Sequence, residues 1–131
     1  MTLRWKIDHD ERLVTLKTSD ELGFHELDAY LHDVANERAL PFRKLWDARE
    51  GSTVLGEDEI DSYVATVSRF MRWQPLGPYA VVVGPDQGLA HDRILSQLLL
   101  TRKRPIRLFS DIVEAQDWLR SQPVPGEEAG A

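Results

Sequence analysis

Hydrophobic and polar positions alternate along the chain with two different periods. Leu3, Trp5 and Ile7 alternate with charged residues, which is the period of a strand with one buried face. A polar turn then leads to a second apolar alternation over residues 12–18. Because the connection between these two segments is so short, we expect them to pair as an antiparallel hairpin.

From Gly23 to the residue before Pro41 the apolar period becomes helical. The segment Phe42–Asp47 then reads as a third strand. Residues 57–73 are the clearest helix, because their apolar residues recur at helical spacing and three acidic residues occupy the first turn, where the helix dipole favours negative charge. Prolines and a glycine over 75–78 end this helix.

The remaining chain continues the alternation of strands and helices. Tyr79–Val83 is almost continuously apolar and β-branched, which indicates an inner strand covered on both faces. A helix through about Thr101 and a strand over Ile106–Phe109 follow. A last helix begins near Ser110 and Asp111, which resemble a helix cap. Residues 123–131 have little to bury, so we expect a disordered tail there.

The order of elements predicts the fold class. It reads β-β-α-β-α-β-α-β-α, which indicates one α/β domain over residues 1–122 with a mixed, mostly parallel five-stranded sheet and four helices. Strands joined by helical crossovers run parallel, with right-handed connections. The first strand should be the antiparallel exception at one edge of the sheet.

Composition narrows the class of protein. The chain has 131 residues, a net charge of −6 and no cysteine, which is typical of one soluble acidic domain without disulfides or thiolate chemistry. An acidic balance argues against general nucleic-acid binding. The charged start of the chain lacks a signal-peptide core, and its longest apolar runs are too short to span a membrane. We therefore expect a cytoplasmic protein that is not an integral membrane protein.

The sharpest motif for function lies in residues 41–53. The predicted strand ends in Asp47 and Arg49 and continues into a short loop with Ser52 and Thr53. Open α/β sheets place their binding crevices at the carboxyl ends of strands, so these four residues are candidates for binding a partner or a ligand. The alternative is that Asp47 and Arg49 pair only with each other at the end of the strand and have no role in binding. This is the commoner situation for such segments.

A second candidate follows the fourth strand. The turn 84–88 opens a helix and contains Asp86, and His91 lies near the start of that helix, where it could face the same crevice as Asp47. An ordinary turn with Asp86 as helix cap is the favoured reading, since no phosphate-binding motif is present. No catalytic triad and no metal-ligand pattern of histidines appears. We therefore expect no metal, no cofactor and no catalytic residue.

The element order also resembles that of the STAS fold of anti-anti-sigma factors and of sulphate-transporter tails. More closely, the chain resembles small bacterial STAS-like proteins of unknown role. The resemblance covers residues 1 to about 121 and rests on the hairpin segments 5–8 and 12–15, the strand 42–49, and the segments 77–83 and 107–119. It implies a regulatory, protein-binding role.

One departure from that family concerns its phosphorylation signature. Anti-anti-sigma factors carry a phosphorylated serine at the start of the helix after the third strand. Residues 54–59 of this chain have no hydroxyl side chain there, and Ser52 and Thr53 lie a few residues earlier. The resemblance therefore does not extend to the phosphorylation switch.

The sequence favours a non-enzymatic binding or regulatory module that contacts a protein partner through the loops after strands three and four. Two alternatives stay open. One is a small-ligand or lipid-binding domain, which requires an apolar pocket of several hundred Å³, and the other is an enzyme that uses Asp47, Arg49 and His91. Partner identity and oligomeric state also stay open, a homodimer being one alternative.

Overall fold

The computed structural model describes residues 3–53, 57–70, 72, 75–84 and 106–125. The helix that the sequence predicts through about Thr101 lies outside these residues, so three of the four expected helices are described. Along the chain the described elements are β1 (Leu3–Asp8), β2 (Leu13–Leu22), α1 (Phe24–Asn36), β3 (Arg43–Thr53), α2 (Glu57–Phe70), β4 (Tyr79–Val82), β5 (Ile106–Phe109) and α4 (Ile112–Arg120).

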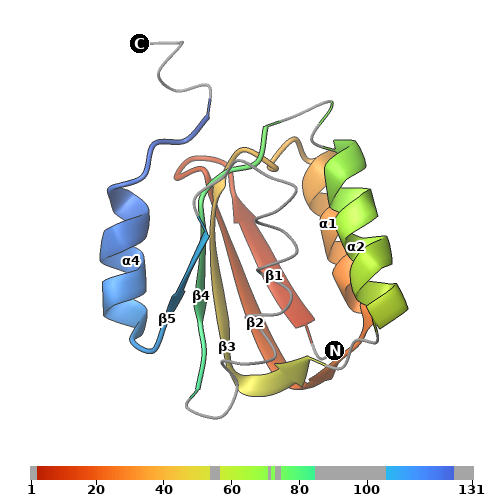
Figure 1. Cartoon of the computed structure of the whole chain (residues 1–131). Coiled ribbons are helices and arrows are strands. Elements are labelled where there is room, and N and C mark those ends of the chain that lie inside the picture. Colours follow the sequence, from red (N-terminus) through yellow and green to blue (C-terminus); the bar gives the residue numbers. More distant parts are fainter. Residues whose placement is uncertain (1–2, 54–56, 71, 73–74, 85–105, 126–131) are drawn as a thin grey trace.

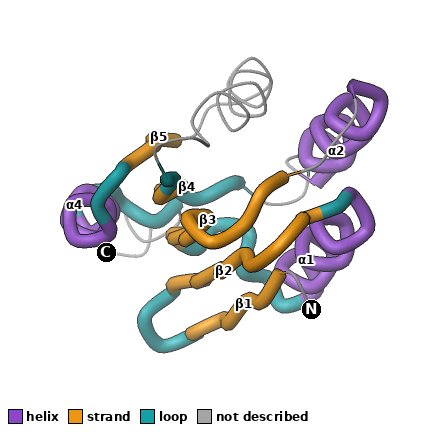
Figure 2. Tube along the Cα trace, turned by 90° about the horizontal axis from the view of Figure 1, so that it is seen from below, coloured by secondary structure: helices purple, strands orange, loops and turns teal. Residues whose placement is uncertain are grey.

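The five strands form one sheet in the order β1-β2-β3-β4-β5. β1 pairs with β2 in antiparallel fashion, and the other three pairs are parallel. Helices α1 and α2 lie on one face of this sheet and α4 lies on the other (Figures 1 and 2). The prediction of a mixed sheet with an antiparallel edge strand is therefore confirmed.

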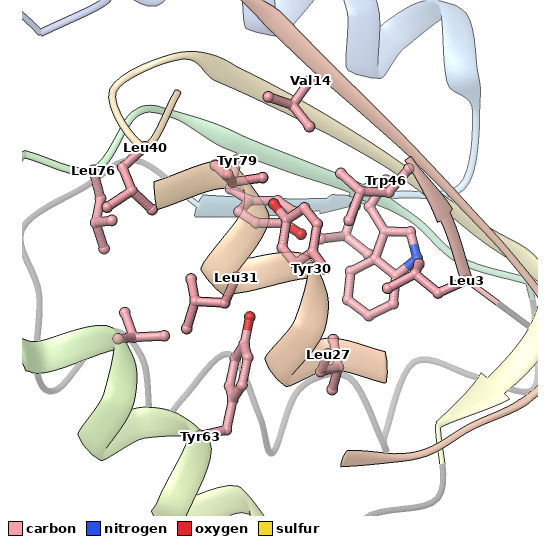
Figure 3. Packing of buried hydrophobic residues seen from close by; sticks show 14 of the residues in the cluster. Leu3, Val14, Leu27, Tyr30, Leu31, Leu40, Trp46, Tyr63, Leu76 and Tyr79 are labelled. Carbon is pink, nitrogen blue, oxygen red and sulfur yellow. The ribbon is translucent and has the colours of Figure 1, made fainter. Parts of the chain in front are cut away.

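The larger core lies between the sheet and the helices α1 and α2. Alternate residues of β1 to β4 point to this face, and they meet the apolar stripe of α1. Tyr30 of α1 and Tyr63 of α2 fill the space between the two helices and Trp46 of the sheet (Figure 3). Every fourth or third position of α1 is buried (Leu27, Tyr30, Leu31 and Val34), which is the stripe that the sequence predicts.

A smaller core lies on the α4 face. Leu45, Ala80 and Val82 of the sheet pack there against Ala115 and Leu119 of α4. The Asp111 carboxylate accepts a hydrogen bond of 2.8 Å from the backbone N–H of Val113, so the expected cap at the start of this helix is confirmed. All of β4 is buried, as expected for a strand covered on both faces.

A buried lysine fastens the start of β3. Lys44 is 2% exposed, and its ammonium Nζ donates hydrogen bonds to three backbone carbonyls of the α1–β3 connection, those of Ala39 (3.2 Å), Leu40 (2.5 Å) and Phe42 (2.7 Å). Gly77 crosses the same connection so closely that a Cβ there would lie 2.2 Å from the Phe42 carbonyl oxygen. Lys44 thus satisfies carbonyls that this tight crossing removes from water.

Three segments differ from expectation. The sequence predicts β2 over 12–18 and the third strand over 42–47, but β2 continues to Leu22 and β3 to Thr53. These polar extensions lack apolar alternation, and they persist as strands because they pair with each other. Val124, which we expected in a tail with nothing to bury, is 2% exposed, so the start of that tail packs on the domain.

The role of Lys44 can be measured by chemical denaturation of Lys44→Met. This change keeps most of the side-chain volume but removes one hydrogen bond from each of three carbonyls, two of which, those of Ala39 and Leu40, still accept a backbone N–H. We therefore expect the free energy of unfolding to fall by about 1–3 kcal/mol. Lys6→Met removes the same charge at an exposed position and should change it by less than about 0.5 kcal/mol. Equal effects of the two changes would contradict the fastening role of Lys44.

Candidate functional site

The predicted site lies in the second half of β3, where a bulge changes the pairing with β2. Lys17 lies opposite Asp47 and Ser19 opposite Glu50, so two steps along β2 match three steps along β3. The extra residue forms a β-bulge, a feature that often redirects side chains near functional sites. Because Lys17 and Ser19 share one face of β2, Asp47 and Glu50 also share one face, the one on which α4 lies.

Gly51 allows β2 and β3 to stay paired beyond this bulge. A Cβ at this position would lie 2.5 Å from Thr18 Cγ2 and 2.9 Å from the carbonyl oxygen of Asp20. Asp20 itself has a positive φ of 60°, a conformation that only a few residue types adopt readily. The segment that the sequence predicts as a Gly/Ser/Thr loop is therefore strand, and this part of the prediction is wrong.

Asp47 and Arg49 form a bidentate ion pair. Arg49 Nε donates to Asp47 Oδ1 at 2.9 Å and Arg49 Nη2 donates to Asp47 Oδ2 at 2.8 Å. The backbone N–H of Arg49 also donates to Asp47 Oδ1 at 3.2 Å. Three hydrogen bonds fix the relative orientation of the two groups, while the Arg49 side chain stays 42% exposed.

The electrostatics of this pair favour the charged form of both groups. The hydrogen bond from the Arg49 side chain lowers the pKa of Asp47 below its ordinary value, and partial burial opposes this only in part. The hydrogen bond to Asp47 raises the pKa of Arg49. A carboxylate held ionised in this way is a poor proton donor or acceptor near neutral pH, so the arrangement suits recognition better than acid–base catalysis.

Further charges surround the pair. Lys17 Nζ lies 3.2 Å from the Glu50 carboxylate, and both side chains are more than half exposed. The carboxylates of Glu50 and Asp111 also act on Arg49 and raise its pKa further. We call Asp47, Arg49 and Glu50 the β3 corner.

The other predicted site residues are not brought into this group. The backbone of Ser52 and Thr53 continues β3, opposite Glu21 and Leu22, and their side chains are outside the described part of the structure. Asp86 and His91 lie outside the described residues. The structure therefore joins Asp47 with Arg49 and adds two residues that sequence reasoning missed, Lys17 and Glu50. A signal for Lys17 exists in the sequence, since it is a charged residue near the end of the second predicted strand.

The two alternative functions, a ligand or lipid carrier and an enzyme, each require structural features that can be looked for among the described residues. A hollow of about 330 Å³ lies between α4 and the strands β2 and β3, with Leu13, Leu45 and Leu119 among its lining residues, and it is partly open to solvent. In the described ranges, no group of three His, Asp or Glu side chains is placed to hold a metal ion. None of the described helices is long and apolar enough to cross a membrane.

No protein-family model and no curated protein sequence matches the chain. Several solved structures have a similar fold, and two of them are described here by their likeness to this chain. One is an uncharacterised DUF3478-family protein with a SpoIIAA-like fold from Shewanella loihica PV-4, with a TM-score of 0.61 and 13% identity over 89% of this chain and 93% of that one. The other is the anti-sigma factor antagonist SpoIIAA in its unphosphorylated form, with a TM-score of 0.53 and 12% identity over 90% of this chain and 97% of that one.

These two likenesses establish the fold. The chain has a SpoIIAA-like, STAS-like α/β fold. The expected resemblance to STAS-like proteins is therefore confirmed at the level of architecture.

The ion pair can be tested by a carbon NMR titration of the Asp47 carboxyl group. In the native protein its pKa should lie below the value of about 3.9 for an unperturbed aspartate. Arg49→Ala should raise this pKa, because it removes the hydrogen bond that lowers it. A carboxyl whose folded pKa is lowered stabilises the fold above its unfolded pKa and loses that contribution as pH falls through the folded pKa. Arg49→Ala should therefore reduce the dependence of stability on pH below about pH 4. An unchanged titration would show that the pair does not persist in solution.

Proposed function

We propose that this protein is a non-enzymatic binding or regulatory module that meets a protein partner at the β3 corner and at the loops after β3 and β4. The observation that carries this proposal is the fixed orientation and the exposure of the Arg49 side chain. Its guanidinium is fixed by Asp47 through two parallel hydrogen bonds, yet 42% of its side chain remains exposed. An exposed cation with a fixed orientation is available to a partner.

Fixing the side chain before binding favours a strong contact. A flexible arginine loses rotamer freedom when it is ordered at an interface, at a cost of about 0.5–1.5 kcal/mol. In this chain the pairing with Asp47 already restricts Arg49 before a partner binds. Much of the rotamer freedom is therefore lost in the free protein, and this loss does not weaken binding. Arginine is also enriched among the few residues that dominate binding at protein interfaces.

The backbone beneath the pair supports the same reading. Asp47 is only 16% exposed and also accepts the backbone N–H of Arg49 across the bulge. The two side chains and the bulge thus form one unit with a defined shape. Beside it, the exposed Lys17–Glu50 pair adds a second set of charges that a partner could match.

The fold adds support from outside the chain. One structure with this fold is described as an anti-sigma factor antagonist, which is a regulatory role. The contact surface is inferred from the β3 corner, because a shared fold alone does not establish a shared function.

The alternative of a small-ligand or lipid carrier has less support. Ligand pockets enclose most of their ligand within about 300–1,000 Å³. The hollow beside α4 is at the low end of this range and is partly open to solvent. This hollow is therefore not the enclosed apolar pocket that a carrier requires.

Arg49→Ala tests the proposal, with thermal melting and partner capture measured side by side. The melting temperature should stay nearly unchanged, because exposed ion pairs contribute little to stability. Capture of the partner from the native cell, quantified by mass spectrometry, should fall by about tenfold or more. Arg69→Ala removes an exposed arginine of α2 on the other face of the sheet and should leave capture unchanged.

A lower melting temperature with unchanged capture would contradict the proposal. In that case Arg49 would be a structural residue that finishes the strand. The partner would then have to bind elsewhere.

A further inference from the structure

Helix α4 covers only part of its face of the sheet. It packs on β3, β4 and β5, and none of the described helices covers β1 and β2 on this side (Figure 2). Side chains alternate along the edge hairpin, so Arg4 and Lys6 of β1 and Lys17 of β2 point to this uncovered face, and all three are exposed. The sheet therefore has an open area with cationic side chains.

Two neighbouring hollows lie on this open area. The hollow of about 330 Å³ beside α4 adjoins a second one of about 210 Å³ over β1 and β2, and Thr15 lines both. The first hollow is lined by the half-buried Leu13 and, deeper in, by the buried Leu45 and Leu119. We call this surface the β1–β2 trough. It lies over β2, between the cationic residues of β1 on one side and α4 on the other.

The charge of the trough is opposite to that of the chain. The whole sequence carries 22 acidic against 16 basic residues. The residues that line the two hollows include a single carboxylate, Glu11, and five cations, namely Arg4, Lys6, Lys17, Arg43 and Arg120. Arg120 is paired with Asp117 and Lys17 with Glu50. Among the described residues no carboxylate lies within ion-pairing distance of Arg4 or Lys6.

The placement of two of these cations is unfavourable for the isolated fold. Arg4 lies directly opposite Lys17 in the antiparallel pair. Like charges at directly opposite positions destabilise a sheet, and Glu50 compensates the charge of Lys17 at 3.2 Å, whereas no described carboxylate pairs with Arg4. A partner with carboxylates would supply such a group.

The dimensions of the uncovered area fit one helix. Neighbouring strands lie about 4.8 Å apart, so two strands offer a width of about 10 Å. This is close to the diameter of an α-helix with its side chains, about 10–12 Å. We propose that the β1–β2 trough is the docking site for an acidic amphipathic helix of a protein partner, packed beside α4, with its apolar side chains toward Leu13 and Leu119 and its carboxylates toward Arg4 and Lys6.

A second copy of the chain does not match this surface in a symmetric dimer. A two-fold axis through the trough would place the cations of one copy against those of the other. The proposal also does not rest on the β3 corner. Unchanged partner capture by Arg49→Ala would contradict the corner and leave the trough unaffected.

The experiment uses a fluorescently labelled synthetic peptide of about 18 residues, or five helical turns, with leucines on one face and glutamates beside them. We expect saturable binding to the full chain in an anisotropy titration, weakened by salt. Amide shifts in an NMR titration should cluster on β1 and β2. Arg4→Glu combined with Lys6→Glu should weaken binding by about tenfold or more. Arg69→Glu combined with Arg72→Glu makes the same charge change on the other face and should alter affinity by less than about twofold.

A second variant tests the shape of the trough. Thr15→Trp places a large ring where the two hollows meet and keeps a residue that strands favour, so it should block the peptide while the fold remains. A peptide of the same composition with its leucines scattered round the helix should bind at least about tenfold more weakly.

Several results would overturn the proposal. One is that the designed peptide shows no saturable binding. Another is that the peptide with scattered leucines binds as tightly as the designed one. A third is that the two double variants bind the designed peptide with equal affinity. Binding to anionic phosphatidylglycerol vesicles that Arg4→Glu with Lys6→Glu abolishes would assign the trough to a membrane surface instead. A concentration-dependent dimer abolished by the same change would assign it to a second copy.

Discussion

The parallel pairing of β3 with β2 is the constraint on which the rest of the structure depends. β3 is the central strand of the sheet, and the side chains on its two faces have different roles. Toward α1 and α2 it places Lys44, which fastens the connection before it, and Trp46, whose indole N–H donates to the hydroxyl of Thr18 on β2. Toward α4 it places Leu45 in the smaller core and then the charged β3 corner. One strand thus holds the core together and positions the candidate site.

The bulge links this pairing to function. Without an extra residue in β3, alternation would keep Asp47 and Arg49 on one face but turn Glu50 away from them, so Glu50 would not join the β3 corner. With the bulge, the carboxylate of Asp47 receives the backbone N–H of Arg49 and holds its guanidinium at the surface. Lys17 pairs with Glu50 and also lines the β1–β2 trough. Two candidate interaction surfaces therefore adjoin on the one face of the sheet that α4 leaves partly open.

The sequence predicts the fold well where hydrophobic periods are regular. The edge hairpin, α1, and the buried β4 all follow from spacing, because a half-buried strand and an amphipathic helix have distinct periods. The extensions of β2 and β3 could not be predicted in this way, since they are polar and exist through pairing with each other. For the site, adjacency in the sequence suggested Asp47 and Arg49. Glu50 joined them only through the bulge, which a linear reading cannot locate.

The central claim is that a protein partner contacts the β3 corner, and site-specific photo-crosslinking tests it most directly. A photoreactive p-benzoylphenylalanine in place of Glu50 lies beside Arg49 without removing it, and the same group in place of the exposed Asp61 of α2 serves as control on the other face. After irradiation of intact native cells, we expect one discrete protein adduct from position 50 and none from position 61. An adduct from position 61 alone, or none from position 50, would show that no partner contacts the β3 corner.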